Sequence, residues 1–222
     1  MLHYRLHHDP KSSHQQISHL LRQLRPKLIL DVGAAQGFLG QLLHDSGLVL
    51  DAIEPQPQWA DHAKPFYRQV YPSTVEQAHL APGTYDAIVC ADVLEHVSDP
   101  AAVLRDLRAA AAPGAAFIVS LPNVAHLAVR LMLLFGRFPR MDRGILDRTH
   151  LHFFTKDTAT VLLESAGLKI EQVHCTGIPL DELFKRGEGK WWFNALMRSQ
   201  HMMLSLLPRL FAMQWVFVAR NT

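Results

Sequence analysis

The stretch LILDVGAAQGFLG, residues 28–40, constrains the fold more than any other part of the chain. An apolar run that ends in Asp31 and Gly33 predicts a buried strand with a sharp turn, and Gly37 stands where a helix would begin. A second apolar run ends in Glu54, 21 residues after Gly33. A carboxylate at that spacing can accept hydrogen bonds from both ribose hydroxyls of a nucleoside. The pattern therefore predicts a nucleoside-cofactor site in an α/β fold, the alternative being an ordinary tight turn.

The glycine spacing bears on which nucleoside binds. A dinucleotide fingerprint is GxGxxG, with the pyrophosphate at the helix N-terminus. Here Gly33 and Gly37 are followed by Gly40, so the central glycine of that fingerprint is missing. Asp31 would also place negative charge near a pyrophosphate, whereas it suits a cationic amino-acid ligand such as S-adenosylmethionine. A nicotinamide dinucleotide is the less favoured alternative.

The rest of the chain alternates short apolar runs with helical patterns, which is typical of a parallel sheet with crossover helices. We expect strands at 27–33, 48–55, 73–75, 85–92, 115–122, 168–175 and 213–220. We expect helices at 17–25, 38–47, 58–67, 99–112 and 156–167. Two segments interrupt the alternation, 123–154 and 176–212, and both are too apolar for disorder. Long insertions of this kind are usually functional.

Composition narrows the class of partner. Lysine plus arginine number 22 against 20 aspartates plus glutamates, which disfavours the long basic footprint of a nucleic-acid-binding protein. Cys90 and Cys175 form neither a CxxC motif nor a disulfide framework, so we expect a reducing cytoplasm. The stretch MLHYRLHHDPKSSHQQ has no apolar core of a secretory signal, and no apolar run is long enough to span a bilayer.

Taken together, the motifs resemble those of class I S-adenosylmethionine-dependent methyltransferases. LDVGAAQG resembles the first motif of that family, Glu54 its ribose-binding acid, YDAIVCADVLEHVSDP its fourth-strand motif, and LRAAAAPGAAFIVSLPN the motif around its fifth strand. The resemblance covers roughly Leu28 to Val173. It implies a doubly wound, Rossmann-like sheet of seven mostly parallel strands, with helices on both faces, an antiparallel last strand, and insertions after strands five and six.

Within that group, LPN followed by GILDRTHLHFFT and LLESAGLKI is similar to bacterial small-molecule methyltransferases. Many relatives of that type accompany glycosyltransferases in cell-surface polysaccharide pathways. The resemblance implies an acceptor hydroxyl on a sugar, a lipid-linked molecule or a natural product. The alternatives are an N-methyltransferase acting on a small amine, a nicotinamide-dependent oxidoreductase, and a non-catalytic cofactor-binding module.

The resemblance also assigns the cofactor site residue by residue. Asp92 would line the methionine end of the cofactor and Leu94 would pack near adenine. Family members commonly have an acid after the third strand that receives the adenine amino group, and Glu76 is the match here. The full set of cofactor-binding residues is Asp31, Gly33, Ala34, Gln36, Gly37, Glu54, Pro55, Glu76, Asp92, Val93 and Leu94.

Methyl transfer from a sulfonium requires alignment of the nucleophile and exclusion of water, and a hydroxyl acceptor also needs a base. Asp147, His150 and His152 lie in the insertion after the fifth strand. We predict that His150 is the general base and that His152 and Asp147 support it. One alternative is a loop that caps the helix at Thr155, and another is an Asp/His/His metal site. We predict no metal.

Three further polar residues follow the fourth and fifth strands, on the face where open α/β sheets bind ligands. Asn123, His126 and His96 are therefore predicted to contact the substrate. For His126, on a helical stripe, and for His96, at a helix start, local hydrogen bonding is the alternative.

The organisation expected is one methyltransferase domain, 1–222, with a core of about 17–175 plus 213–220, a substrate loop at 123–154 and an apolar helical lid at 176–212. The lid contains WWFNALMRSQHMMLSLL, whose apolar residues fall on a helical stripe. The alternatives for 191–212 are a homodimer surface and interfacial membrane contact. Tryptophans flanked by Lys185, Arg186 and Lys190 suit a headgroup region.

Overall fold

The computed structural model describes residues 12–180, 184 and 190–222, and Lys185 and Arg186 lie outside that part of the chain. The strands are β1 Leu28–Val32, β2 Val49–Ile53, β3 Gln69–Tyr71, β4 Tyr85–Ala91, β5 Ala111–Pro122, β6 Leu168–Thr176 and β7 Gln214–Asn221. The helices are α1 Ser13–Leu24, α2 Phe38–Leu43, α3 Pro57–Ala63, α4 Pro100–Ala110, α5 Leu127–Leu134, α6 Lys156–Ser165, α8 Trp191–Leu206 and α9 Pro208–Phe211. Two 3₁₀ turns, η1 His44–Ser46 and η2 Lys64–Phe66, extend α2 and α3.

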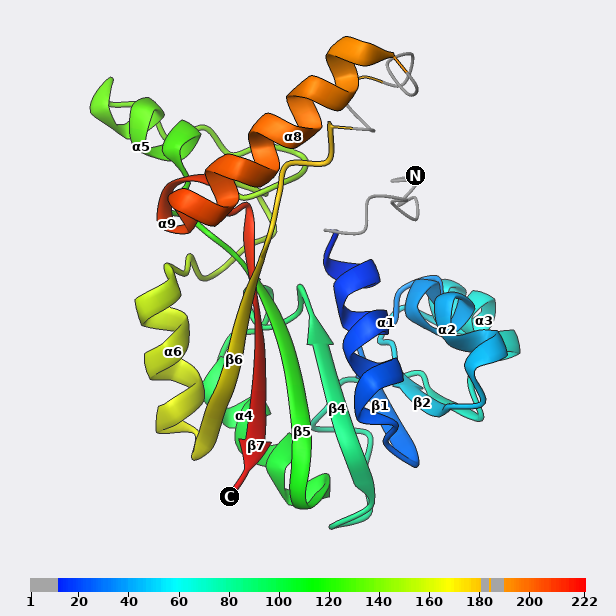
Figure 1. Ribbon diagram of the computed structural model, residues 1–222. Helices are drawn as coiled ribbons and strands as arrows, with labels where there is room; N and C mark the ends of the chain where they lie inside the picture. The colour runs from blue at the N-terminus through cyan, green and yellow to red at the C-terminus, as the bar shows by residue number, and fades with distance from the viewer. Residues whose placement is uncertain (1–11, 181–183, 185–189) are drawn as a thin grey trace.

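All seven strands form one sheet in the order β3-β2-β1-β4-β5-β7-β6 (Figure 1). The strands from β3 to β5 in that order pair in parallel. The last strand, β7, runs antiparallel to both of its neighbours, β5 and β6. The predicted α/β class, the mostly parallel sheet and the antiparallel last strand are therefore confirmed.

Two apolar cores lie on opposite faces of the sheet. Side chains on a strand alternate between faces, so Ile29 joins one core and its neighbour Leu30 the other. The core that contains Ile29 is closed by α1, α2 and α3, and the core that contains Leu30 by α4 and α6. Figure 1 shows these two helical layers on either side of the sheet. The layers leave the carboxyl ends of the parallel strands free to form a site.

The helix starts follow the capping residues in the sequence. Asp99 caps α4 by accepting a hydrogen bond of 2.9 Å from the Ala102 amide, with Pro100 in the first turn. Thr155 caps α6 through reciprocal bonds with Thr158. α1 begins at Ser13, earlier than the predicted residue 17. Both the α4 and the α6 predictions are confirmed.

The predicted third strand at 73–75 is wrong. β3 lies at Gln69–Tyr71, paired with β2, and the chain then turns at Pro72, with the Gln77 amide donating to the Thr74 carbonyl. Pro72 has no amide hydrogen and ends the pairing. β3 is an edge strand with no buried residue, which is why no continuous apolar run marks it in the sequence.

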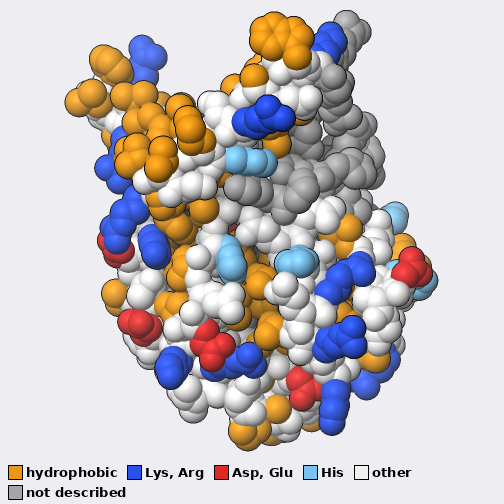
Figure 2. All heavy atoms as spheres, viewed as in Figure 1, with side chains coloured by type: hydrophobic (Ala, Val, Ile, Leu, Met, Phe, Trp, Pro, Cys, Tyr) orange, Lys and Arg blue, Asp and Glu red, His pale blue; other side chains and the backbone are white. Residues whose placement is uncertain are grey.

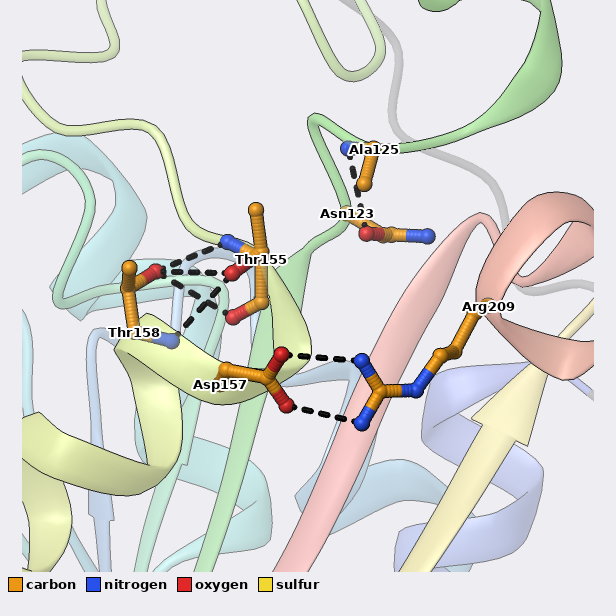
Figure 3. A network of polar contacts seen from close by, with 6 residues as sticks. All are labelled: Asn123, Ala125, Thr155, Asp157, Thr158 and Arg209. Atoms are coloured by element: carbon orange, nitrogen blue, oxygen red, sulfur yellow. Dashed lines mark hydrogen bonds and ion pairs between the residues drawn. The ribbon is translucent and has the colours of Figure 1, made fainter.

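The two insertions stand at one end of the sheet, with α5, α8 and α9 beyond the carboxyl ends of the parallel strands (Figure 1). Asp157 of α6 forms two bonds, of 2.8 and 3.0 Å, with Arg209 of α9 (Figure 3). Gln200 of α8 both donates to and accepts from the backbone of Ile178. Leu204 of α8 belongs to the core beneath. Among the described residues, no helix is long and apolar enough to cross a membrane.

We expect the turn after β1 to tolerate no side chain at Gly33. Its φ of +71° is left-handed, and an added Cβ would lie 2.7 Å from Cγ2 of Val93. Gly47 has nearly the same φ, +73°, but nothing within 4 Å. Urea unfolding should show a loss of about 1–2 kcal/mol for Gly47→Ala, from backbone strain alone. Gly33→Ala should lose roughly 1–3 kcal/mol more through overpacking. Equal losses would contradict the contact with Val93.

Candidate cofactor and catalytic site

The turn between β1 and α2 is held by backbone bonds to the end of β2. Gly33, Ala35 and Gly37 all have positive φ. The amides of Gly33 and Ala34 donate to the Ile53 carbonyl over 2.8 and 3.2 Å. The positive φ values at Gly33 and Gly37 explain why the turn has glycine at these two positions, as predicted. Ala34 is buried, and Gln36 is half-buried at the rim of the turn.

Glu54 connects this turn to the next one. One carboxylate oxygen accepts a bond of 2.8 Å from the Ala35 amide, and the other accepts 2.9 Å from the Gln56 amide. Burial raises the pKa of Glu54, and these two bonds act in the opposite direction. The carboxylate stands at the carboxyl end of β2, where the ribose-binding acid is predicted. Pro55 follows it and is exposed.

Asp31 is buried beneath the turn. It accepts a bond of 2.5 Å from the Tyr67 hydroxyl, which in turn accepts from the Gly40 amide. Burial raises the pKa of Asp31 to about 7, the Tyr67 bond lowers it, and the charge of Glu54 raises it further. A cation bound nearby would favour the ionised form.

Asp92 directly follows β4 and has a strained backbone, at φ +55°. Its carboxylate accepts 2.9 Å from the Ser120 hydroxyl of β5 and 2.8 Å from the Gln214 amide of β7. Three strands therefore fix this carboxylate. Asp31, Glu54 and Asp92 stand at the ends of β1, β2 and β4, which are adjacent in the sheet.

Leu94 and Glu76, both predicted to lie near adenine, differ in burial. Leu94 has no exposed surface and lies in the core, so we correct its assignment from adenine contact to core packing. Val93, half-buried, packs against Gly33. Glu76 is exposed in the turn after β3, where a bond from the Thr74 hydroxyl lowers its pKa. Its contact with adenine stays a prediction.

The loop that carries the histidines is fastened to the segment after β4. The amides of Leu151 and His152 donate to the Glu95 carbonyl over 2.7 and 3.2 Å. The His96 ring donates to the Thr149 carbonyl over 3.3 Å, and His152 Nε2 donates to Ser98 over the same distance. These bonds hold the predicted substrate loop at the carboxyl ends of the strands.

His150 is buried and oriented by the backbone. Its Nδ1 lies 3.1 Å from the Ile145 carbonyl, which can only accept, so Nδ1 carries the proton. In the neutral ring Nε2 then has a free lone pair. Burial lowers the pKa of His150, and the charge of His96 lowers it further. The two rings meet edge to face with centroids 4.8 Å apart.

Asp147 has a different role from the one predicted. Its carboxylate accepts bonds of 2.8 and 2.7 Å from the amide and hydroxyl of Thr149, which close a turn. The group that orients His150 is the Ile145 carbonyl rather than Asp147. Asp147 acts on His150 only through its charge, which raises the pKa of the imidazole.

Glu95 is a polar residue of this site that the sequence pattern does not predict. It is fully buried, and neither carboxylate oxygen has a partner among the described residues. Burial, with a contribution from the charge of Asp92, raises its pKa well above 4.5. Glu95, His96 and His150 each bring a ligand-type atom within 4.8 Å of the others, a set that could hold a divalent cation. His152 and Asp147, which the alternative Asp/His/His metal site would include, are not part of this set.

Asn123 and His126 are held within the protein. Asn123 is buried and donates to the Ala212 carbonyl over 2.8 Å. Its side-chain oxygen accepts from the Ala125 amide over 3.2 Å (Figure 3). His126 caps α5 by accepting from the Ala128 amide, so the local role is confirmed. Its buried Nε2 has no partner among the described residues. Substrate contact stays a prediction for both.

The sequence profile of a methyltransferase domain family matches residues 2–173. The chain belongs to this family. It is similar to a ubiquinone biosynthesis O-methyltransferase of Aeromonas salmonicida, 30% identical over 176 residues that cover 73% of this chain and 71% of the relative. A ubiquinone biosynthesis O-methyltransferase of Xanthomonas euvesicatoria is 28% identical over 156 residues, covering 65% of this chain and 64% of that one.

Solved structures share the fold at low identity. A S-adenosylmethionine-dependent methyltransferase of Archaeoglobus fulgidus superposes with a TM-score of 0.61 at 14% identity, covering 93% of this chain and 94% of that chain. The 1,6-didemethyltoxoflavin-N1-methyltransferase of Burkholderia thailandensis, solved with S-adenosylhomocysteine, gives 0.62 at 16% identity, covering 96% and 79%. The chain is a class I S-adenosylmethionine-dependent methyltransferase.

The site of this methyltransferase fits its cofactor. S-adenosylmethionine carries a sulfonium and an ammonium group, and the ends of β1, β2 and β4 offer three carboxyl groups in a row. Glu54 can receive ribose hydroxyls with its remaining lone pairs, because each oxygen accepts one backbone bond. The left-handed turn at Gly33 keeps side chains away from the same edge.

We expect Glu95 to make stability depend on pH. Its pKa is raised on folding. The contribution of its protonated form to the free energy of unfolding is therefore fully present below about pH 4.5 and is lost as the pH rises through the raised pKa. Glu95→Gln removes this dependence. In urea unfolding at pH 5 and pH 8, the free energy of wild type relative to Glu95→Gln should fall with pH, by at most about 1.4 kcal/mol per pH unit. Glu164→Gln, at an exposed site, is the control. Parallel curves would mean that folded Glu95 is ionised.

We expect methyl transfer to continue after dialysis against a chelator, because the sulfonium already activates the methyl group and the sequence motifs predict no metal. The rate with a fixed acceptor should be unchanged with and without added Mg²⁺, Mn²⁺ or Zn²⁺. A rate that is lost on chelation and restored by one cation would contradict this expectation. Sensitivity of that restored rate to Glu95→Gln would then locate the cation at the Glu95, His96 and His150 group.

Proposed function

We propose that this methyltransferase methylates a hydroxyl group of a small molecule, with His150 as the general base. The observation that carries the proposal is the bond from His150 Nδ1 to the Ile145 carbonyl. That bond leaves the lone pair of Nε2 for the proton of an acceptor. The lowered pKa keeps the ring neutral near pH 7.

The chain's own residues divide the work. Bound S-adenosylmethionine supplies an activated methyl group. It would give that methyl group to the acceptor oxygen and keep the electron pair of the broken carbon–sulfur bond on its sulfur, and His150 Nε2 would take the hydroxyl proton. Asp92, fixed by Ser120 and Gln214, positions the methionine end. Glu54 orients the ribose, and the loop fastened to Glu95 limits the access of water.

Two features support a hydroxyl acceptor. A buried neutral imidazole is useful when a hydroxyl must lose its proton, whereas an amine often needs no base. The relatives from Aeromonas and Xanthomonas carry the name O-methyltransferase.

A sugar, a lipid-linked molecule and a natural product remain the acceptor classes, and α8 would act as an apolar lid over them. We place the protein in the cytoplasm. Contact of 191–212 with a membrane or a second copy stays a prediction.

An acceptor screen tests the proposal. The purified protein is incubated with methyl-labelled S-adenosylmethionine and with a phenol, a prenylated phenol, a monosaccharide or an aliphatic amine, and the methylated atom is found by mass spectrometry. We expect the label on oxygen. Label on nitrogen alone would overturn the hydroxyl assignment and leave the methyltransferase assignment intact.

Replacing His150 tests its role as base. We expect His150→Ala to lower kcat by roughly 10²- to 10⁴-fold while the Kd for S-adenosylmethionine stays within a factor of two to three, because the base acts only in proton transfer. His62→Ala, an exposed histidine on α3, is the matched control. Near-normal turnover by His150→Ala would overturn the assignment.

The pH dependence gives a second readout for the same base. The pKa of His150 lies below its ordinary 6.5, so kcat/KM of the wild type should be flat above that pH and fall only below it. The acid limb should be absent from the residual activity of His150→Ala. An acid limb that survives the substitution would assign the base elsewhere.

A further inference from the structure

Residues 127–143 form what we call the basic apolar arm: α5 and the chain that follows it as far as Arg143. Large apolar side chains along it are exposed, Leu134 by 76% and Phe135 by 75%. Leu131, Leu133, Phe138 and Met141 are between 42% and 50% exposed. A helix that is apolar on all sides is normally buried in a core or in lipid. We therefore expect a binding partner or a lipid surface to cover these exposed apolar side chains.

The body of the protein does not supply that cover among the described residues. Val129 is the one buried residue of α5. In Figure 1, α5 extends away from the sheet, and in Figure 2 hydrophobic side chains gather over it with basic side chains beside them. Contiguous apolar patches of this kind usually mark an interaction site.

The charge of the arm identifies the kind of surface that it fits. It contains Arg130, Arg137, Arg140 and Arg143 against a single acid, Asp142, which pairs with Arg148. The Arg130 side chain donates to the Ala125 carbonyl over 2.6 Å. Arg140 donates to the carbonyls of Arg148 and His150 over 2.7 and 2.8 Å. These bonds hold two guanidinium groups without neutralising their charge.

We propose that the basic apolar arm docks on a membrane surface that carries anionic headgroups. Leu134 and Phe135, at the end of α5, enter the boundary between headgroups and acyl chains. The arginines remain at headgroup level, because their long side chains reach back to the phosphates. The attraction of each basic residue to an anionic leaflet adds to the apolar burial. The arm docks without spanning the bilayer.

A second copy of the chain fits the same surface poorly. A symmetric dimer through the arm would place each arginine-rich face against an identical one. Like charges would then oppose each other, with Asp142 already paired to Arg148. An anionic lipid surface satisfies both the apolar and the basic character of the arm.

The arm connects directly to the loop that carries His150. Arg140 donates to the His150 carbonyl, and its guanidinium lies over the Phe153 ring at 5.3 Å from the centroid. Docking would therefore set the catalytic loop close to the lipid surface, within reach of an acceptor that resides there. This consequence rests on the proposed function, whereas the docking itself does not.

Co-sedimentation with vesicles tests the docking without any acceptor. We expect wild type to bind vesicles of phosphatidylcholine with phosphatidylglycerol at least tenfold more tightly than phosphatidylcholine alone, and less tightly as salt is raised. Leu134→Ser/Phe135→Ser should abolish binding. Val161→Ser, at a 64% exposed site on α6, should leave binding unchanged. Arg137→Gln should weaken it by about fivefold, and Arg105→Gln on α4 should not.

Three outcomes would overturn the proposal: no binding of wild type to anionic vesicles, equal binding to neutral ones, or full binding by Leu134→Ser/Phe135→Ser. Sedimentation velocity can reveal a fourth such outcome. If wild type is a dimer without lipid and the double variant is a monomer, the arm is an interface between two copies of the chain. Retained S-adenosylmethionine binding shows that the variants fold. Methyl transfer to a water-soluble acceptor should be unchanged in the double variant, so a failure of docking and a failure of the proposed function are distinguishable.

Discussion

The site depends on the buried carboxylate of Glu54. It accepts the amide of Ala35 with one oxygen and that of Gln56 with the other, so the turns after β1 and β2 share a single side chain. Removing the carboxylate would leave two amides at the edge of the sheet without their acceptor. The backbone strain at Ala35, a non-glycine residue with a φ of +47°, is tolerable because this carboxylate and the Ile53 carbonyl hold the turn in place.

The side of the site that we propose for the acceptor is assembled by contacts between segments far apart in sequence. Gln214 reaches Asp92, Asn123 reaches the carbonyl of Ala212, and Arg209 pairs with Asp157. Each of these contacts brings the start of β7, or the helix before it, onto the ends of β4, β5 or α6. The antiparallel β7 completes the sheet, and α8 and α9, which precede it in the chain, stand beyond the carboxyl ends of the parallel strands. The histidine loop enters from the other insertion and is fastened at Glu95.

Local chemistry made much of this predictable. Gly33 and Gly37 could be predicted because only glycine adopts their backbone conformation without cost. Glu54 could be predicted because the spacing of one βα unit is nearly fixed. Asp99 and Thr155 were readable as helix caps. β3 was not, because an edge strand without buried residues has no apolar run to mark it.

Contacts between distant segments were out of reach. Glu95 in VLEHV reads as a solvated charge at a helix start, but its side chain is fully buried, and its carbonyl accepts the amides of Leu151 and His152. Its proximity to His150 joins residues 55 positions apart. The support that we predicted from Asp147 for His150 fails for a related reason. The Asp147 carboxylate accepts from Thr149, and the His150 imidazole donates to the Ile145 carbonyl. The backbone carbonyl leaves no mark in the sequence.

The central claim is that the cofactor's methyl group points at His150 while Glu54 holds the ribose. A crystal structure with S-adenosylhomocysteine and an acceptor hydroxyl compound tests it directly. The account predicts ribose hydroxyls on Glu54, the homocysteine sulfur beside Asp92, and the acceptor oxygen within hydrogen-bond distance of His150 Nε2. An acceptor oxygen bonded to another base, with protein lying between that oxygen and His150 Nε2, would contradict the account.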